Sequence, residues 1–260
     1  MTVAKTQKPC VALLGEFSAG KSTLANLMLG ASPLPVQVIA TNLPPVLVTY
    51  GHGSAVRIDT SDVSHPVDLR NLSNVPLDTT KVIRIERTDA ILERCSILDM
   101  PGISDPNMHI NVWERVLPLA DAFVWCTHAT QAWRQSEASF WRQVDSDIQK
   151  KSILLVTRFD KLAGTNDRHR VLRRVQAEAG GHFGRILPIA LLEAQDAGDD
   201  VSKWEKCGAD AFAKAFASMV DTISMERNGV MQPPGNNPAD IPVSEQRPKI
   251  VPRRVTRYAG

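Results

Sequence analysis

A phosphate-binding pattern stands near the start of the chain, at residues 15–22. They read Gly-Glu-Phe-Ser-Ala-Gly-Lys-Ser and match GxxxxGK[ST] in full, between an apolar run and a segment of helical period. Such a turn gathers backbone N–H groups at a helix N-terminus, where the helix dipole also favours an anion. Lys21 would then reach the β- and γ-phosphates of a nucleotide, and the Ser22 hydroxyl would bind Mg²⁺. The residues expected around the nucleotide phosphates are Glu16, Phe17, Ser18, Ala19, Gly20, Lys21, Ser22 and Thr23.

Two further segments could complete a metal and phosphate site. Asp99-Met100-Pro101-Gly102 follows the short apolar run 95–98; its carboxylate can hold Mg²⁺ through a water, and the Gly102 N–H can meet the γ-phosphate. Thr41 ends the loop 33–41 within the Pro-rich stretch 33–45, and is the threonine we expect to close on Mg²⁺ and the γ-phosphate, unless it only caps a strand. The expected metal ligands are Ser22, Thr41 and Asp99, and the expected catalytic residues include Lys21, Ser22, Thr41 and Gly102.

The base is expected to be read by Thr157-Arg158-Phe159-Asp160, which is close to the [NT]KxD element that selects guanine. A carboxylate at Asp160 can accept hydrogen bonds from guanine N1–H and N2–H₂ together, whereas adenine would leave it unsatisfied. Arg158 stands where lysine is usual, and its planar guanidinium could stack on a purine. The Ala190 N–H could donate to guanine O6, although Pro188-Ile189-Ala190-Leu191 is equally well a plain strand end. GTP is therefore the expected ligand.

The elements that must position these residues alternate between apolar runs and helical periods. This alternation predicts βαβ units, and hence an α/β fold of the P-loop NTPase type with a mostly parallel central sheet and helices on both faces. Antiparallel pairing is expected between 55–59 and 82–87, around a polar loop at 61–80. Strands are expected at 10–15, 46–50, 55–59, 82–87, 95–98, 122–126, 153–156 and 186–189. Helices are expected at 22–29, after residue 110, over 131–150, at 168–179 and from about 204 to 228.

Composition bounds the class of protein. The 260 residues are 43% hydrophobic and 22% charged, as in ordinary soluble domains, and the net charge of +2 argues against a nucleic-acid partner. No apolar run approaches a membrane span or a signal peptide, so the expected location is cytoplasmic. The four cysteines lack metal-ligand spacing and are expected to be reduced core residues.

The C-terminal stretch differs from the rest of the chain. Residues 232–260 carry five Lys/Arg against two Asp/Glu, which leaves the remainder slightly acidic. We expect a GTPase domain at 8–229 and a Pro-rich basic tail at 230–260 without regular structure. The tail could attach weakly to an anionic membrane surface or to a protein partner, or it could be a solvated linker.

These motifs together resemble the GTPase domain of the dynamin superfamily. GEFSAGKST is similar to the P-loop of its bacterial members, Ala40-Thr41-Asn42-Leu43-Pro44 to its threonine loop, and DMPG to its DxPG. TRFDKLAGTND, from residue 157, is similar to its guanine element. The resemblance implies Mg²⁺-dependent hydrolysis of GTP to GDP and phosphate, and a homodimer formed between GTPase domains across the nucleotide. Residues 131–137 would match a segment used at that dimer interface.

The resemblance also bears on how water would be activated. Ile103 stands where Ras-like enzymes orient water with glutamine, and Phe17 replaces a polar glutamine of the classical dynamins. Ser18 matches the family serine that can hold a monovalent cation, and is added to the expected catalytic residues. Dimerisation would then speed a slow monomer. No helical stalk follows residue 228, so membrane remodelling by self-assembly is not expected.

Two other functions stay open. A nucleotide-gated binding module would hold GTP with negligible turnover and signal through the loops at 33–41 and 103–108, and Ile103 and Phe17 favour it. A Ras-like or ribosome-assembly GTPase would carry a folded RNA-binding appendage, and the sequence offers none.

Overall fold

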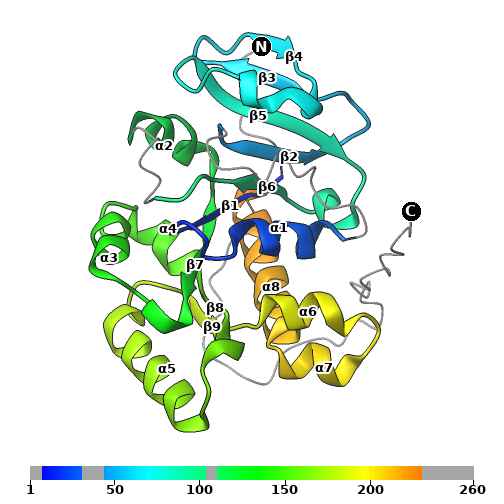
Figure 1. Cartoon of the computed structure of the whole chain (residues 1–260). Coiled ribbons are helices and arrows are strands. Elements are labelled where there is room, and N and C mark those ends of the chain that lie inside the picture. Colours follow the sequence, from blue (N-terminus) through cyan, green and yellow to red (C-terminus); the bar gives the residue numbers. More distant parts are fainter. Residues whose placement is uncertain (1–7, 31–43, 104–109, 230–260) are drawn as a thin grey trace.

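One large sheet organises the molecule (Figure 1). The computed structural model describes residues 8–30, 44–103 and 110–229. Within these ranges the sheet has nine strands in the order β4-β3-β5-β2-β6-β1-β7-β8-β9. The strands are β1 (Cys10–Gly15), β2 (Val46–Tyr50), β3 (Val56–Asp59), β4 (Ser64–Pro66), β5 (Thr80–Arg87), β6 (Ser96–Asp99), β7 (Ala122–His128), β8 (Ile153–Thr157) and β9 (Arg185–Pro188).

The pairing of the strands confirms a mostly parallel sheet. β1 lies between β6 and β7 and is parallel to both, and β8 and β9 continue in parallel beyond β7. β2 joins β6 antiparallel and β5 parallel, and β3 pairs antiparallel with β5 and β4. The expected antiparallel pair of 55–59 and 82–87 is thus confirmed as β3 and β5, and the polar loop between them contributes β4.

Helices cover both faces of the sheet, as expected (Figure 1). The alternation in β1 shows why: Val11 and Leu13 pack into one core with α1, α6 and α8, whereas Ala12 and Leu14 pack into another with α3 and α5. The helices are α1 (Lys21–Leu29), α2 (Ile110–Val116), α3 (Gln135–Trp141), α4 (Ser146–Lys151), α5 (Thr165–Ala179), α6 (Leu191–Ala197), α7 (Val201–Lys206) and α8 (Ala209–Arg227). None of the helices in the described ranges could cross a membrane.

The expected single helix over 131–150 is wrong, because two separate signals interrupt it. Trp133 has φ 58° and precedes α3, and the Asp145 carboxylate accepts from the Asp147 N–H at 2.8 Å and starts α4 anew. The aromatic stripe is nevertheless core: Trp133 and Trp141 are buried.

The expected final helix is also divided. Gly208, at φ 88°, separates α7 from α8, and a Cβ there would lie 2.2 Å from the Pro188 carbonyl oxygen, so only glycine fits. Helix α6 was not expected at all. The cysteines are buried and free, as expected. Thr41 and the tail at 230–260 lie outside the described residues, so their predictions stay untested.

Candidate functional site

The phosphate loop links the end of β1 to the start of α1. Gly15 has φ 139°, and a Cβ on it would lie 2.1 Å from the Cys126 carbonyl oxygen, so no other residue fits. The chain then turns, with the Ala19 N–H donating to the Glu16 carbonyl at 3.2 Å, and Ser18 adopts φ 59°. Residues 16–20 therefore wrap the N-terminus of α1, where a phosphate is favoured.

Lys21 folds back over this loop. Its side chain is buried, and Nζ donates to the carbonyl oxygens of Gly15 at 3.1 Å and Glu16 at 2.8 Å. Ser22 and Thr23 follow it in the first turn of α1 and are half-buried. The ammonium group thus lies at the phosphate loop, where a phosphate-binding lysine must be.

The segment 99–103 lies directly against the phosphate loop. Strand register places Asp99 opposite Leu13, and the Ile103 N–H donates to the Gly15 carbonyl at 3.2 Å. A Cβ on Gly102 would approach the Phe17 Cα and N at 2.9 Å, so the two backbones touch. The two motifs that the sequence separates by nearly eighty residues therefore form one site.

Asp99 is a buried carboxylate with unmet hydrogen-bonding capacity. Within the described residues its Oδ1 has no hydrogen-bond partner. Burial raises the pKa of Asp99 to about 6, although the Lys21 charge and the Met100 N–H oppose this rise. An unsatisfied buried oxygen is costly, and hard oxygen donors such as Asp99 and Ser22 suit Mg²⁺. The residues present fit that ion. The described residues contain no cluster of three or more His, Cys, Asp or Glu that could hold a metal by itself.

The predicted base-reading residues are connected to the phosphate loop. Thr157 is fully buried, and its hydroxyl donates to the Ala19 carbonyl at 2.7 Å. Arg158 adopts φ 52°, and its Nη2 donates to the Ser18 carbonyl at 3.1 Å. Thr157 and Arg158 therefore brace the loop from the side of β8. This support by their side chains was not foreseen from the sequence.

Asp160 lies in the turn that follows Arg158, with Oδ2 3.2 Å from the Lys161 Nζ. Its side chain is only 17% exposed, whereas that of Lys161 is 60% exposed. The Ala190 prediction needs correction in this arrangement, because the Ala190 N–H donates to the Cys207 carbonyl at 2.9 Å and is not available to guanine O6. The reason is the junction of α7 and α8, which folds back beside β9.

A contact at the other side of the loop was not predicted. The Ser136 hydroxyl donates to Glu16 Oε1 at 2.7 Å, and the Arg134 Nη1 lies 3.9 Å from Glu16 Oε2. Both side chains come from the start of α3. No local sequence pattern signals this contact, because the two sides of it are 120 residues apart.

Fold and site together define a P-loop domain of the GTPase type. The Dynamin family model matches residues 11–159, more than half of the chain, and the chain belongs to the dynamin family.

Three similar proteins match most of this chain, but this chain spans less than half of the length of each. Dynamin-like protein 2 of Campylobacter jejuni subsp. jejuni serotype O:23/36 (strain 81-176) is 24% identical over 226 residues, which make up 84% of this chain and 36% of that protein. Two structures titled as an oligomerised bacterial dynamin pair, for long-range sensing and tethering of membranes, share 17% identity. Their TM-scores are 0.64 and 0.61, over 88% and 87% of this chain and 39% and 41% of theirs. The structures support the fold.

Proposed function

We propose that this domain is a Mg²⁺-dependent GTPase, which binds GTP and hydrolyses it to GDP and phosphate. The observation that carries the proposal is the buried Asp99 carboxylate, with an oxygen unpartnered among the described residues, at a loop that already holds Lys21. Membership of the dynamin family supports the same activity.

The roles of the residues follow from their places. The backbone N–H groups of residues 16–20 and the Lys21 ammonium would bind the phosphates, and Gly102 would approach the γ-phosphate. Ser22 and Asp99 would hold Mg²⁺, with Thr41 as a further ligand, and the ion would neutralise charge on the phosphates. Asp160 would select guanine, with Arg158 and Thr157 supporting the loop. A water would attack the γ-phosphorus in line with the departing GDP.

Activation of the attacking water is the step for which we propose that a second copy of the domain is needed. Ile103 packs partly buried against the core, and Phe17 is 55% exposed at the loop, so neither offers a polar group to water. An exposed phenylalanine beside a nucleotide site favours contact with a partner. We propose that a nucleotide-dependent homodimer completes the site, and that Ser18 helps to hold a monovalent cation there. Turnover per molecule should then rise with protein concentration.

Location and further partners are part of the proposal. The proposed domain is cytoplasmic and associates peripherally with a membrane surface. The peripheral association is suggested by a structure of similar fold, which concerns tethering of membranes. The basic tail at 230–260 would provide weak attachment to anionic lipid or to a protein. No nucleic-acid partner is proposed, because the net charge is only +2.

Ile103 and Phe17 also favour a second function, that of a GTP-binding module. With Ile103 and Phe17 in place of polar residues, the domain could bind GTP as a gated module and turn it over negligibly. Single-turnover hydrolysis of GTP at high protein concentration separates the two functions, with Lys21→Ala as control.

The binding step has its own test. Titration of the wild-type protein with fluorescent GTP, GDP and ATP at fixed Mg²⁺ should show tighter binding of the guanine nucleotides. Lys21→Ala should lower the affinity for all three nucleotides. Equal affinity for GTP and ATP would falsify the role of Asp160, and no binding of either would overturn the proposed function.

A further inference from the structure

Glu137 is a buried carboxylate that lies outside the nucleotide site. It stands in the first turn of α3 and is 1% exposed. Its Oε1 accepts from the Trp125 indole Nε1 at 2.8 Å, and its Oε2 accepts from the Thr127 hydroxyl at 3.0 Å and the Arg134 N–H at 2.8 Å. All three partners are donors, so the arrangement suits an ionised carboxylate, which only accepts. Burial raises the pKa of Glu137, and these three hydrogen bonds counter the rise.

These bonds attach the start of α3 to strand β7. Trp125 and Thr127 belong to β7, whereas Arg134 directly precedes α3. The Thr127 hydroxyl also accepts from the Trp133 N–H at 2.9 Å. Trp133 has φ 58°, which bulky residues rarely adopt and which persists only where the surroundings hold it. The hydrogen bonds of Thr127 to Trp133 and to Glu137 keep Trp133 in this conformation.

The segment held in this way contacts the phosphate loop. Ser136 donates to the Glu16 carboxylate at 2.7 Å, and Arg134 approaches it at 3.9 Å. The Glu16 carbonyl in turn accepts from the Lys21 Nζ at 2.8 Å. Hydrogen bonds and adjacent backbone therefore connect the buried Glu137, through Ser136 and Glu16, to the phosphate-binding lysine.

We propose that Glu137 is a positioning residue for the phosphate loop: it fixes the start of α3, so that Ser136 and Arg134 hold Glu16 in the conformation that binds phosphate. The proposal rests on the nucleotide-binding function proposed above. Glu137 touches neither nucleotide nor metal, and it acts only through residues 134–136.

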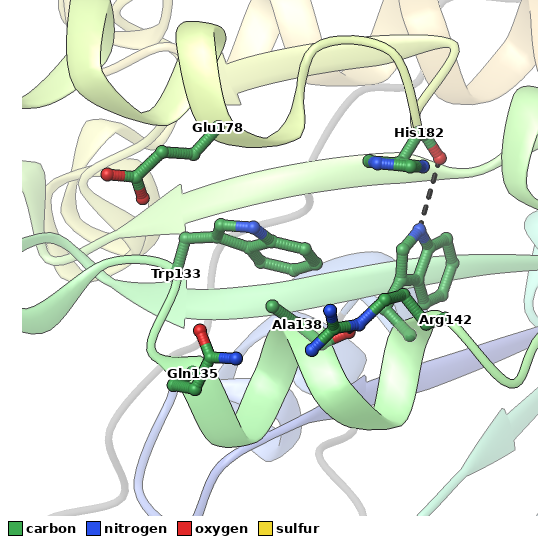
Figure 2. Close-up of a pocket in the computed structure, with 7 residues that line it drawn as sticks. Trp133, Gln135, Ala138, Arg142, Glu178 and His182 are labelled. Atoms are coloured by element: carbon green, nitrogen blue, oxygen red, sulfur yellow. Dashed lines mark hydrogen bonds between the residues drawn. The ribbon is translucent and has the colours of Figure 1, made fainter.

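Another face of α3 supplies a matched control. A pocket of about 130 Å³ lies on that side of the helix, and Glu137 is not among the residues that line it. Figure 2 shows these residues. Arg142 is exposed there, and among the described residues its guanidinium donates to groups of α3, the Ala138 carbonyl at 3.3 Å and the Ser139 hydroxyl at 3.1 Å. The pocket is lined by Trp133, Gln135, Ala138, Trp141, Arg142, Glu178 and His182. Arg142→Ala thus alters α3 without touching a group bonded to Glu137 or Glu16.

The first experiment measures GTP affinity in a double-mutant cycle. Glu137→Gln keeps the shape but places an NH₂ group against donors, and Ser136→Ala removes the exposed hydroxyl that reaches Glu16. Each should weaken GTP binding by about tenfold, the size of one lost hydrogen bond. Ser136→Ala should cost little more in the Glu137→Gln background, because both act through one contact. Arg142→Ala should stay within about twofold of wild type.

Additive losses for Glu137→Gln and Ser136→Ala would overturn the proposal, since Glu137 would then act by another route. If Glu137→Gln does not fold, Ser136→Ala decides alone, and an unchanged affinity refutes the proposal.

A second measurement does not depend on nucleotide binding. Hydrogen exchange in the nucleotide-free protein follows the Ala19 N–H, which the Glu16 carbonyl holds at 3.2 Å. Ser136→Ala and Glu137→Gln should speed exchange over residues 16–20, whereas Arg142→Ala should not. Equal exchange in all variants would refute the positioning role. Failure of the wild type to bind GTP would instead refute the proposed function, so the two failures are distinguishable.

Discussion

Asp99 gives the nucleotide-free protein a pH dependence that can be worked out from the structure. The residue is only 8% exposed, and burial raises the pKa of its carboxyl group from the usual 3.8 to about 6. Below about pH 4 the group is protonated in both the folded and the unfolded chain, so it does not alter the free energy of unfolding. Between about pH 4 and pH 6 only the folded chain keeps the proton, so stability falls as the pH rises.

The size of this fall follows from the shift. A rise of about two pKa units corresponds to about 3 kcal/mol of free energy of unfolding, which is lost between about pH 4 and pH 6 and is not regained at higher pH. Asp99→Asn removes the titration. The asparagine amide is itself an unpaired buried group and lowers the free energy of unfolding by about 1–3 kcal/mol, but this effect does not change with pH.

The assay is urea unfolding of wild type and Asp99→Asn, without nucleotide and with a chelator, from about pH 4 to pH 8. The informative quantity is the difference in unfolding free energy between the two proteins, because every other titrating group is shared. That difference should move by about 3 kcal/mol in favour of the asparagine variant as the pH rises. A difference that stays constant across the range would refute the buried, desolvated state of Asp99.

Three further outcomes are expected. Gly102→Ala should lower the unfolding free energy in urea by about 1–3 kcal/mol, because its Cβ would lie 2.9 Å from the Phe17 backbone. Asp160→Asn should weaken GTP binding about 100-fold in a fluorescence titration, the loss of two hydrogen bonds to a charged group, and should improve binding of xanthosine triphosphate. Cys95 and Cys126, whose thiol pKa values burial raises to about 12, should resist alkylation at pH 8 in the folded protein and react once urea unfolds it.

The phosphate loop and its metal carboxylate could be predicted because the signals are local or follow from strand direction. A strand, a glycine turn and a helix are contiguous in residues 10–29, so the pattern fixes the geometry of the turn. Asp99 ends a strand parallel to β1, and the carboxyl ends of parallel strands meet at one edge of a sheet. For Asp99 the one long-range assumption needed was that its strand lies beside β1.

The helix breaks could be predicted only in part. Asp145 is an ordinary helix-capping residue and could have been noticed in the stretch 131–150. The break at Gly208 depends on how closely α8 packs on Pro188, and the sequence does not contain that distance. At the same junction the Cys207 carbonyl accepts from the Ala190 N–H. The local pattern of residues 188–191 could not predict this contact.

The contact between Glu16 and Ser136 shows why the rest of the site escaped prediction. The two residues are 120 positions apart, and their meeting depends on the left-handed Trp133 and on the buried Glu137 that lies behind it. A helical pattern treats Glu137 as a surface residue, since carboxylates are rarely buried unless they are paired or hydrogen-bonded. Only the coincidence of three donors from β7 and the helix start makes its burial tolerable. The loop that binds phosphate is therefore local in sequence, but the groups that hold its conformation are not.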